Sequence, residues 1–172
     1  MIVLALDIAI STGVAVGSSG GQPVSSTVNL GKPPNGRRFS NALRMTQDLI
    51  SEHKPDLIVA EAAIGGPKAS AFLIGLVACV EGCAFNRGIP FETINLGTIR
   101  KSFLGKHLTT RHFPSLSQKA AKQAIKMQVV QGCALRGWSV HNDDEADALA
   151  LWDYACATHA RGYQSRPHGG LF

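Results

Sequence analysis

Apolar residues in the first half of the chain fall in short runs that predict strands. The apolar run at 2–6 ends on a carboxylate at position 7, and short strands are predicted at 12–17 and 25–30, separated by a Gly-rich turn. Three short strands joined by turns favour an antiparallel meander. The apolar run 56–61 and the segment 91–95 predict two further strands.

Helices are predicted between and after these strands, which makes the chain an α/β protein. Their ranges are 37–53, 69–85, 97–104, 118–136 and 143–158, with a basic loop at 105–116. The segment 69–85 has very little polar surface. We expect one of its faces to cover the sheet and another to contact a partner chain, and a helix wholly buried within a monomer is the alternative.

The charges are unevenly distributed along the chain. The 172 residues carry a net charge of +5, and positions 93–142 contain Lys and Arg but no Asp or Glu. This basic stretch runs directly into a cluster of acids at 143–147, as expected where phosphates are drawn to a metal site. Net charge alone is weaker evidence, because it permits any anionic partner.

Length and composition exclude several classes of protein. The chain is expected to form one domain with a core of its own. The four cysteines lack the paired short spacing of zinc sites, so we expect buried, reduced thiols. The chain lacks the basic start of a signal peptide and any apolar run of about 20 residues. We therefore expect a cytosolic protein that does not span a membrane.

Carboxylates stand at structurally awkward positions in this pattern. Asp7 and Glu61 each end a buried strand, where a charge needs compensation. Asp144 and Asp147 are three residues apart on one face of the last helix, and that face continues in apolar residues toward the sheet. Asp143 and Glu145 are expected to point toward solvent and to serve the helix N-terminus.

Two strand ends and one helix terminus would bring Asp7, Glu61, Asp144 and Asp147 together. Taken singly, each acid fits an ordinary buried or capping role, but four adjacent carboxylates cannot all ionise without cations among them. Hard divalent ions with oxygen ligands, Mg²⁺ or Mn²⁺, are the natural compensation. A pair of such ions about 4 Å apart can activate water and clamp a phosphodiester.

Three motifs in this order resemble the RuvC-type Holliday junction resolvases. They are "STGVAV" after the first acid, "IVAE" ending the fourth strand and "DEADALALWDYA" on the last helix. The chain is most similar to the short RuvC-like proteins of bacteriophages, over about residues 1–160. The resemblance implies an RNase H-like (retroviral integrase) fold, with a five-stranded mixed sheet flanked by helices. Residues 161–172 are expected to form a flexible tail.

The resemblance also implies an activity. The family's catalytic acids, which bind two Mg²⁺ or Mn²⁺ ions, would correspond to Asp7, Glu61, Asp144 and Asp147. The implied reaction is endonucleolytic cleavage of a four-way DNA junction by symmetric nicks, which leaves a 5′-phosphate and a 3′-hydroxyl. The implied assembly is a homodimer, for which the helix at 69–85 would supply the contact.

Basic residues near the acids are candidate DNA contacts. The family's basic residues near the site would correspond to Arg100 and to Lys122 or Lys119. Lys119, Lys122 and Lys126 share one face of the helix 118–136, opposite Ala121, Ala124, Ile125 and Leu135. An ordinary solubilising face is the alternative for these lysines. The full candidate set is Arg100, Lys101, Lys106, Arg111, Lys119, Lys122 and Lys126.

The chain departs from the family at one functional position. The family often carries an aromatic residue shortly after the second acid, thought to wedge into the junction, whereas this chain has Ile64. An aliphatic side chain can also insert between bases, and Phe113 in the basic loop is a second candidate wedge. His141, just before the acid cluster, is a candidate proton shuttle or ligand, and an exposed loop histidine is the alternative.

Two other functions are compatible with parts of this sequence pattern. A non-catalytic protein that binds branched DNA could use the same fold, but it would gain nothing from acids that face phosphates. An ATPase of the actin or hexokinase type also begins with an acid and a Ser/Thr–Gly turn. That architecture needs a second phosphate-binding domain, and 172 residues contain no second copy.

Overall fold

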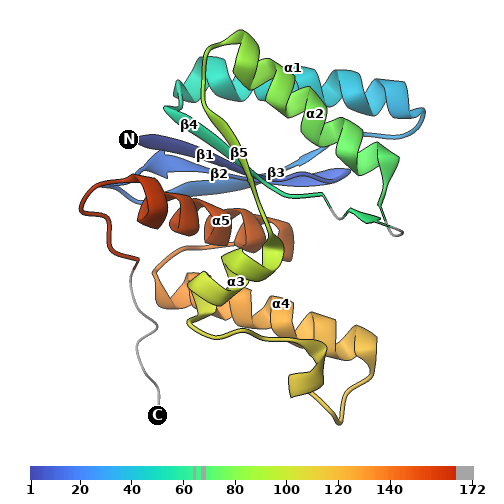
Figure 1. Cartoon of the computed structure of the whole chain (residues 1–172), viewed down its shortest axis with the longest axis vertical. Helices are drawn as coiled ribbons and strands as arrows, with labels where there is room; N and C mark the ends of the chain where they lie inside the picture. Colours follow the sequence, from blue (N-terminus) through green and yellow to red (C-terminus); the bar gives the residue numbers. More distant parts are fainter. Residues whose placement is uncertain (64, 67–68, 166–172) are drawn as a thin grey trace.

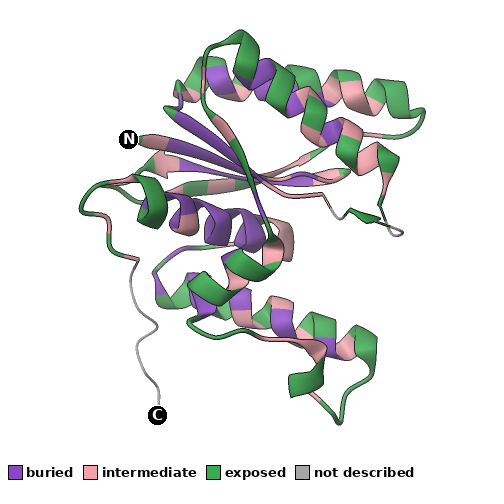
Figure 2. Cartoon of the chain, viewed as in Figure 1, coloured by how far each residue is buried: buried purple, intermediate pink, exposed green. Residues whose placement is uncertain are grey.

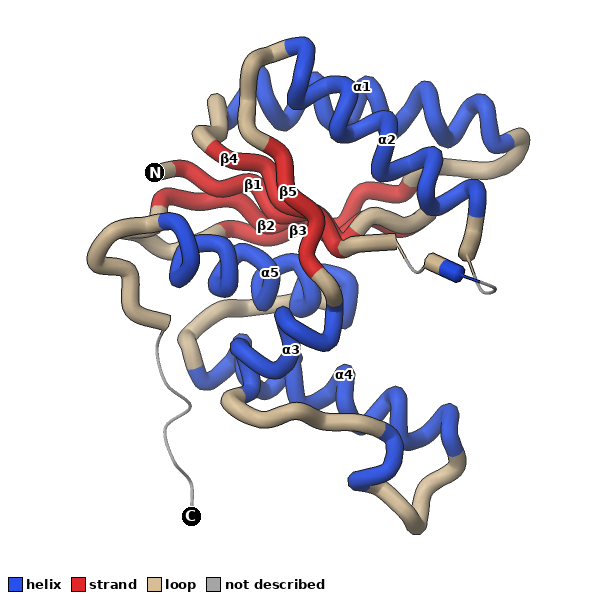
Figure 3. The backbone as a smooth tube through the Cα atoms, in the orientation of Figure 1, coloured by secondary structure: helices blue, strands red, loops and turns tan. Residues whose placement is uncertain are grey.

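A five-stranded mixed sheet forms the centre of the protein (Figures 1 and 3). The computed structural model describes residues 1–63, 65–66 and 69–165. The strands lie in the order β3-β2-β1-β4-β5. Their bounds are Ile2–Asp7 (β1), Ser11–Ser18 (β2), Val24–Asn29 (β3), Leu57–Glu61 (β4) and Phe91–Ile94 (β5).

The strand directions confirm the predicted meander. Strands β1, β2 and β3 pair antiparallel in sequence, and β4 then pairs parallel with β1, and β5 parallel with β4. The central strand β1 is apolar from Ile2 to Leu6, as expected for a strand whose two faces are both covered by helices. Its residues alternate between two cores, with Val3 and Ala5 in one and Leu4 and Leu6 in the other.

Two layers of helices cover the sheet (Figure 1). On one face lie α1 and α2, while α5 covers the other, with α3 and α4 packed on its outer side. The bounds are Asn35–His53 (α1), Ala71–Asn86 (α2), Leu96–Leu104 (α3), Gln118–Leu135 (α4) and Asp143–His159 (α5). Helix α5 is buried almost all round, as Figure 2 shows, because it lies between the sheet and α3 and α4.

Helix α2 has one buried and one exposed side. Leu76, Val80 and Ala84 face the sheet, which confirms that one face of this apolar helix covers it. On the outer side, Ile74 is 46% exposed and Phe85 is 83% exposed. The alternative of a wholly buried helix is therefore wrong, and the predicted contact with a partner chain concerns this exposed side.

A buried polar network joins the end of the described chain to the core. Asp153 on α5 pairs with Arg136, and both side chains are almost completely buried. The Tyr163 hydroxyl and the Ser165 hydroxyl each donate a hydrogen bond to Asp153. The first part of the predicted flexible tail thus contacts α5, whereas 166–172 lie outside the described residues.

The four cysteines are free thiols, as predicted, and three of them are buried. Burial raises the pKa of the Cys133 and Cys156 thiols to about 12, so both stay protonated at neutral pH. Within the described residues, every helix is too short or too polar to cross a membrane.

Candidate functional site

Two of the predicted acids lie side by side at one edge of the sheet. Asp7 is the last residue of β1 and Glu61 the last of β4. These strands are adjacent and parallel, with Leu6 opposite Ala60. Parallel neighbours place their carboxyl ends at the same edge, so both carboxylates face one region.

Helix α5 brings the other two acids to the same edge. Its first turn crosses β2 so closely that a Cβ added to Gly13 would lie 2.0 Å from the carbonyl oxygen of Asp144. Gly13 is also the residue of β2 that pairs with Asp7. A residue without a side chain at this position lets the helix start directly above the end of β1, with Asp144 and Asp147 on the near side.

The charges of the helix acids act on the two strand acids. Burial, followed in order of effect by the neighbouring charges of Glu61, Asp147 and Asp144, raises the pKa of Asp7 to about 8. Burial and Asp147 also raise the pKa of Glu61, to which Asp7 is hydrogen-bonded. Without a compensating cation, Asp7 therefore favours its protonated form at neutral pH.

Basic side chains neutralise part of this charge. Arg100 on α3 donates hydrogen bonds to both carboxylate oxygens of Asp147, at 2.8 Å to Oδ2 and 3.1 Å to Oδ1. The side chain of Arg100 is 17% exposed and that of Asp147 is 8% exposed. Lys126 on α4 pairs with Asp143, whose pKa it lowers below the usual range. Arg100 and Lys126 thus compensate negative charges of Asp147 and Asp143 that a metal ion could compensate instead.

The donor set fits a hard divalent cation in chemistry but not in its present arrangement. All four side chains offer carboxylate oxygens, the preferred ligands of Mg²⁺ and Mn²⁺. Among residues 1–63, 65–66 and 69–165, however, no three His, Cys, Asp or Glu side chains are grouped to hold a metal ion. In this arrangement Asp147 is paired with Arg100, and Asp7 is hydrogen-bonded to Glu61.

The prediction that Glu145 points to solvent is wrong. Its side chain is 4% exposed and lies against β3, where Ser25 and Thr27 each donate a hydrogen bond to it at 3.2 Å. Asp143, by contrast, is partly exposed at the helix start. His141 is 85% exposed, and its Nδ1 lies 3.3 Å from Glu145. Its role in proton transfer or metal binding stays a prediction.

The candidate DNA contacts surround the acids on α3, α4 and the loop between them. Lys101, Lys106, Arg111, Lys119 and Lys122 are exposed, while Arg100 and Lys126 turn inward to the acids. The buried positions of α4 include Ala121 and Ile125, as predicted. Leu135 was expected on that face as well, but it is 56% exposed because it is the last residue of the helix.

Of the two candidate wedge residues, the structure describes Phe113. Ile64 lies outside the described residues. Phe113 is half-buried and follows the short 3₁₀ helix Thr110–His112 in the basic loop. The side chain of Thr109 and the ring of His112 stabilise this turn by a reciprocal capping arrangement, which sequence reasoning missed.

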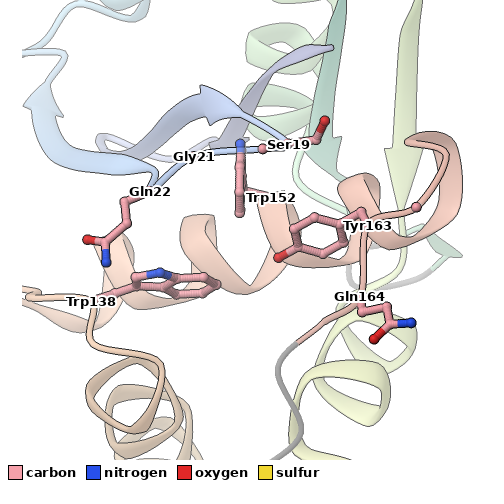
Figure 4. A pocket seen from close by; sticks show the side chains of 9 residues that line it. Ser19, Gly21, Gln22, Trp138, Trp152, Tyr163 and Gln164 are labelled. Carbon is pink, nitrogen blue, oxygen red and sulfur yellow. The ribbon is translucent and has the colours of Figure 1, made fainter.

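A separate aromatic hollow lies at the opposite end of the sheet, near the amino end of β1 (Figure 4). Its volume is about 220 Å³. Trp138, Trp152 and Tyr163 form its wall, and Trp152 is fully buried and donates a hydrogen bond to the Gly17 carbonyl. These aromatic rings therefore serve core packing. Within the described residues, the carboxylates are the stronger candidates for a functional site.

The raised pKa of Asp7 makes stability depend on pH. Between 3.8 and about 8 the folded protein binds more protons than the unfolded chain, so the free energy of unfolding falls as pH rises. Asp7→Asn removes this contribution because an amide does not titrate. We expect the melting temperature of wild-type protein in EDTA to drop relative to that of Asp7→Asn by several degrees between about pH 5 and pH 8, since about 1 kcal/mol corresponds to about 2–4 °C. Parallel melting curves over this range would contradict the raised pKa.

Comparison with known proteins identifies the fold. No family model and no curated protein sequence matches the chain. Among solved structures it is similar to RuvC from Thermus thermophilus, with a TM-score of 0.65 and 17% identity over 88% of this chain and 90% of that one. The T. thermophilus RuvC in complex with a Holliday junction substrate matches with a TM-score of 0.61, 17% identity and the same coverage. The chain therefore has the RNase H-like fold of RuvC, which confirms the predicted fold class.

Proposed function

We propose that the protein is a metal-dependent endonuclease that resolves Holliday junctions and acts on related branched DNA. The observation that carries the proposal is that carboxylates from β1, β4 and α5 lie near one sheet edge, where the charges of the others act on Asp7. The shared fold with RuvC, which has been solved in complex with a Holliday junction substrate, supports the choice of DNA.

The four acids have distinct parts in the proposed site. Asp7, Glu61, Asp144 and Asp147 would hold two Mg²⁺ or Mn²⁺ ions, which supply an activated water and charge compensation for the leaving oxygen when bound. The rigid strand ends fix Asp7 and Glu61, and α5 fixes the other two. Hydrolysis would leave a 5′-phosphate and a 3′-hydroxyl.

The basic residues would hold the DNA backbone beside the acids. Lys122 and Lys119 lie exposed on α4, about one and two turns from Lys126, which pairs with Asp143. Lys101, Lys106 and Arg111 extend the positive surface over α3 and the following loop. Such a surface binds phosphates without reading sequence. In this proposal Phe113 and Ile64 are the candidates that open the junction.

The exposed side of α2 suits a second copy of the chain. Ile74, Ala78 and Phe85 fall at helical spacing on that side, with Glu81 between Ala78 and Phe85, and exposed apolar residues grouped in this way favour a protein contact. A homodimer through α2 would present two acid sites, as symmetric nicking of a four-way junction requires. The bacteriophage affinity and the cytosolic location stay predictions from the sequence.

A cleavage assay tests the proposed activity. We expect wild-type protein with Mg²⁺ or Mn²⁺ to make paired nicks in a labelled four-way junction and to leave the matched linear duplex intact. Asp7→Asn should lose cleavage but keep junction binding, because it removes a ligand without changing the basic surface. Asp48→Asn, an exposed acid of α1, is the matched control and should cleave normally. Junction binding without cleavage in either metal would favour the non-catalytic binder, and ATP hydrolysis without cleavage would favour the ATPase.

The oligomeric state tests the role of α2. We expect wild-type protein to form a dimer and Phe85→Glu to be monomeric by light scattering, because the charge would lie in an apolar contact. Phe85 is exposed in the single chain, so the substitution should leave the melting temperature nearly unchanged. Met127→Glu on α4 changes another exposed apolar residue and should stay dimeric. A dimeric Phe85→Glu would show that α2 is not the contact.

The ion pair of Arg100 with Asp147 predicts competition with the metal. In Arg100→Gln both oxygens of Asp147 become available, and one positive charge leaves the site. We expect Mn²⁺ to bind about tenfold tighter or more by isothermal titration, since a unit charge at this distance contributes more than about 1 kcal/mol. Lys101→Gln removes the same charge from an exposed neighbour and should change the affinity little. An unchanged or weaker affinity in Arg100→Gln would contradict the competition.

A further inference from the structure

The Glu145 carboxylate accepts more hydrogen bonds than a role at the helix N-terminus alone requires. It is the third residue of α5, and its backbone N–H donates to the side chain of the N-cap residue Asn142 at 2.9 Å. Its carboxylate accepts from Ser25 and Thr27 at 3.2 Å each, and from the backbone N–H of His141 at 3.1 Å. Asn142 adds a second link, because its amide donates to the Thr27 hydroxyl at 2.8 Å.

These bonds fasten the start of α5 to the edge strand of the sheet. Ser25 and Thr27 are two residues apart on β3, so both side chains stand on the face that α5 covers. A buried carboxylate is costly unless its hydrogen bonds are satisfied, and here both oxygens are engaged. Glu145 is thereby directed away from Asp7, and its oxygens are not available as metal ligands.

The register of the sheet links this contact to the acids. Thr27 of β3 pairs with Gly13 of β2, and Gly13 pairs with Asp7 of β1, so the three residues form one row across three strands. The first turn of α5 lies over this row. Glu145 is bonded at the Thr27 end, and the Asp144 carbonyl rests on Gly13 in the middle. The position of the helix along the row fixes how far Asp144 lies from Asp7.

We propose that Glu145, held by Ser25 and Thr27, is a positioning residue that sets the distance between the helix acids and the strand acids. This inference rests on the proposed function, because it concerns the metal ligands of that site. Displacement of groups that orient metal ligands lowers metal affinity or activity by about 10- to 100-fold. A shift of the helix end by about 1 Å has a comparable effect on catalysis.

The test removes one hydroxyl far from the acids in sequence. Thr27→Val is nearly isosteric but cannot donate to Glu145 or accept from Asn142, whereas Thr27→Ser keeps the hydroxyl. We expect Mn²⁺ affinity, measured by isothermal titration on folded protein well below its melting temperature, to fall about 10- to 100-fold in Thr27→Val and to stay near wild type in Thr27→Ser. Ser26→Ala, on the opposite face of β3, is the matched control and should match wild type.

Kinetics and a second variant separate positioning from stability. In Thr27→Val, kcat for junction cleavage should fall while KM changes little, because the basic DNA surface is intact. Glu145→Gln keeps the shape of the side chain and one acceptor oxygen, and it should give a smaller loss of Mn²⁺ affinity than Glu145→Ala. If Thr27→Val fails to fold, the order of affinities wild type, Glu145→Gln, Glu145→Ala carries the test.

The outcomes distinguish this inference from the proposed function. If wild-type protein binds Mn²⁺ and Asp7→Asn does not, while Thr27→Val and both Glu145 variants bind as wild type does, the positioning role is wrong and the metal site stands. If wild-type protein does not bind Mn²⁺, the metal site and the positioning role both fail. A lower melting temperature with unchanged Mn²⁺ affinity would assign Glu145 a purely structural role.

Discussion

Asp7 and Glu61 end two paired parallel strands, where burial and the charge of Asp147 both oppose their ionisation. The two strand acids are hydrogen-bonded to each other, and cations from the outer layer pair with the helix acids, Arg100 with Asp147 and Lys126 with Asp143. A folded core would be more stable without such a group of charges. Their retention at one edge therefore points to chemistry rather than to stability.

The rest of the architecture serves to place α5 on that edge. Val3 and Ala5 of β1 form an apolar floor, and α3 and α4 cover the outer side of the helix, which leaves it buried almost all round. Gly13 permits the close approach, and the contact of Glu145 with β3 fixes where the helix starts. Because α5 is packed on nearly all sides, Asp144 and Asp147 have little freedom to move away from Asp7 and Glu61.

Local sequence patterns were enough to predict the four acids, whereas contacts between residues far apart in the sequence could not be predicted from them. Asp7 and Glu61 were predicted because each ends an apolar run, and the three-residue spacing of Asp144 and Asp147 put them on one face. The position of Glu145 was predicted wrongly because its partners are hydroxyls more than a hundred residues away, on a strand whose run of polar residues suggests exposure to water. Arg100 was predicted as a DNA contact. Its ion pair with Asp147, which lies 47 residues away, could not be predicted from a local pattern either.

Under the proposed function, the position of the inward-facing cations would link DNA binding to metal binding. Arg100 and Lys126 belong to α3 and α4, the same helices that present Lys101, Lys119 and Lys122 to solvent. Under the proposed function, a phosphate bound on this surface competes with Asp147 for Arg100. Each cation that turns to the phosphate frees carboxylate oxygens and leaves the acids with uncompensated charge. Substrate binding would then raise the affinity for divalent ions, and metal binding would raise the affinity for DNA by the same factor, because coupling between two sites is reciprocal.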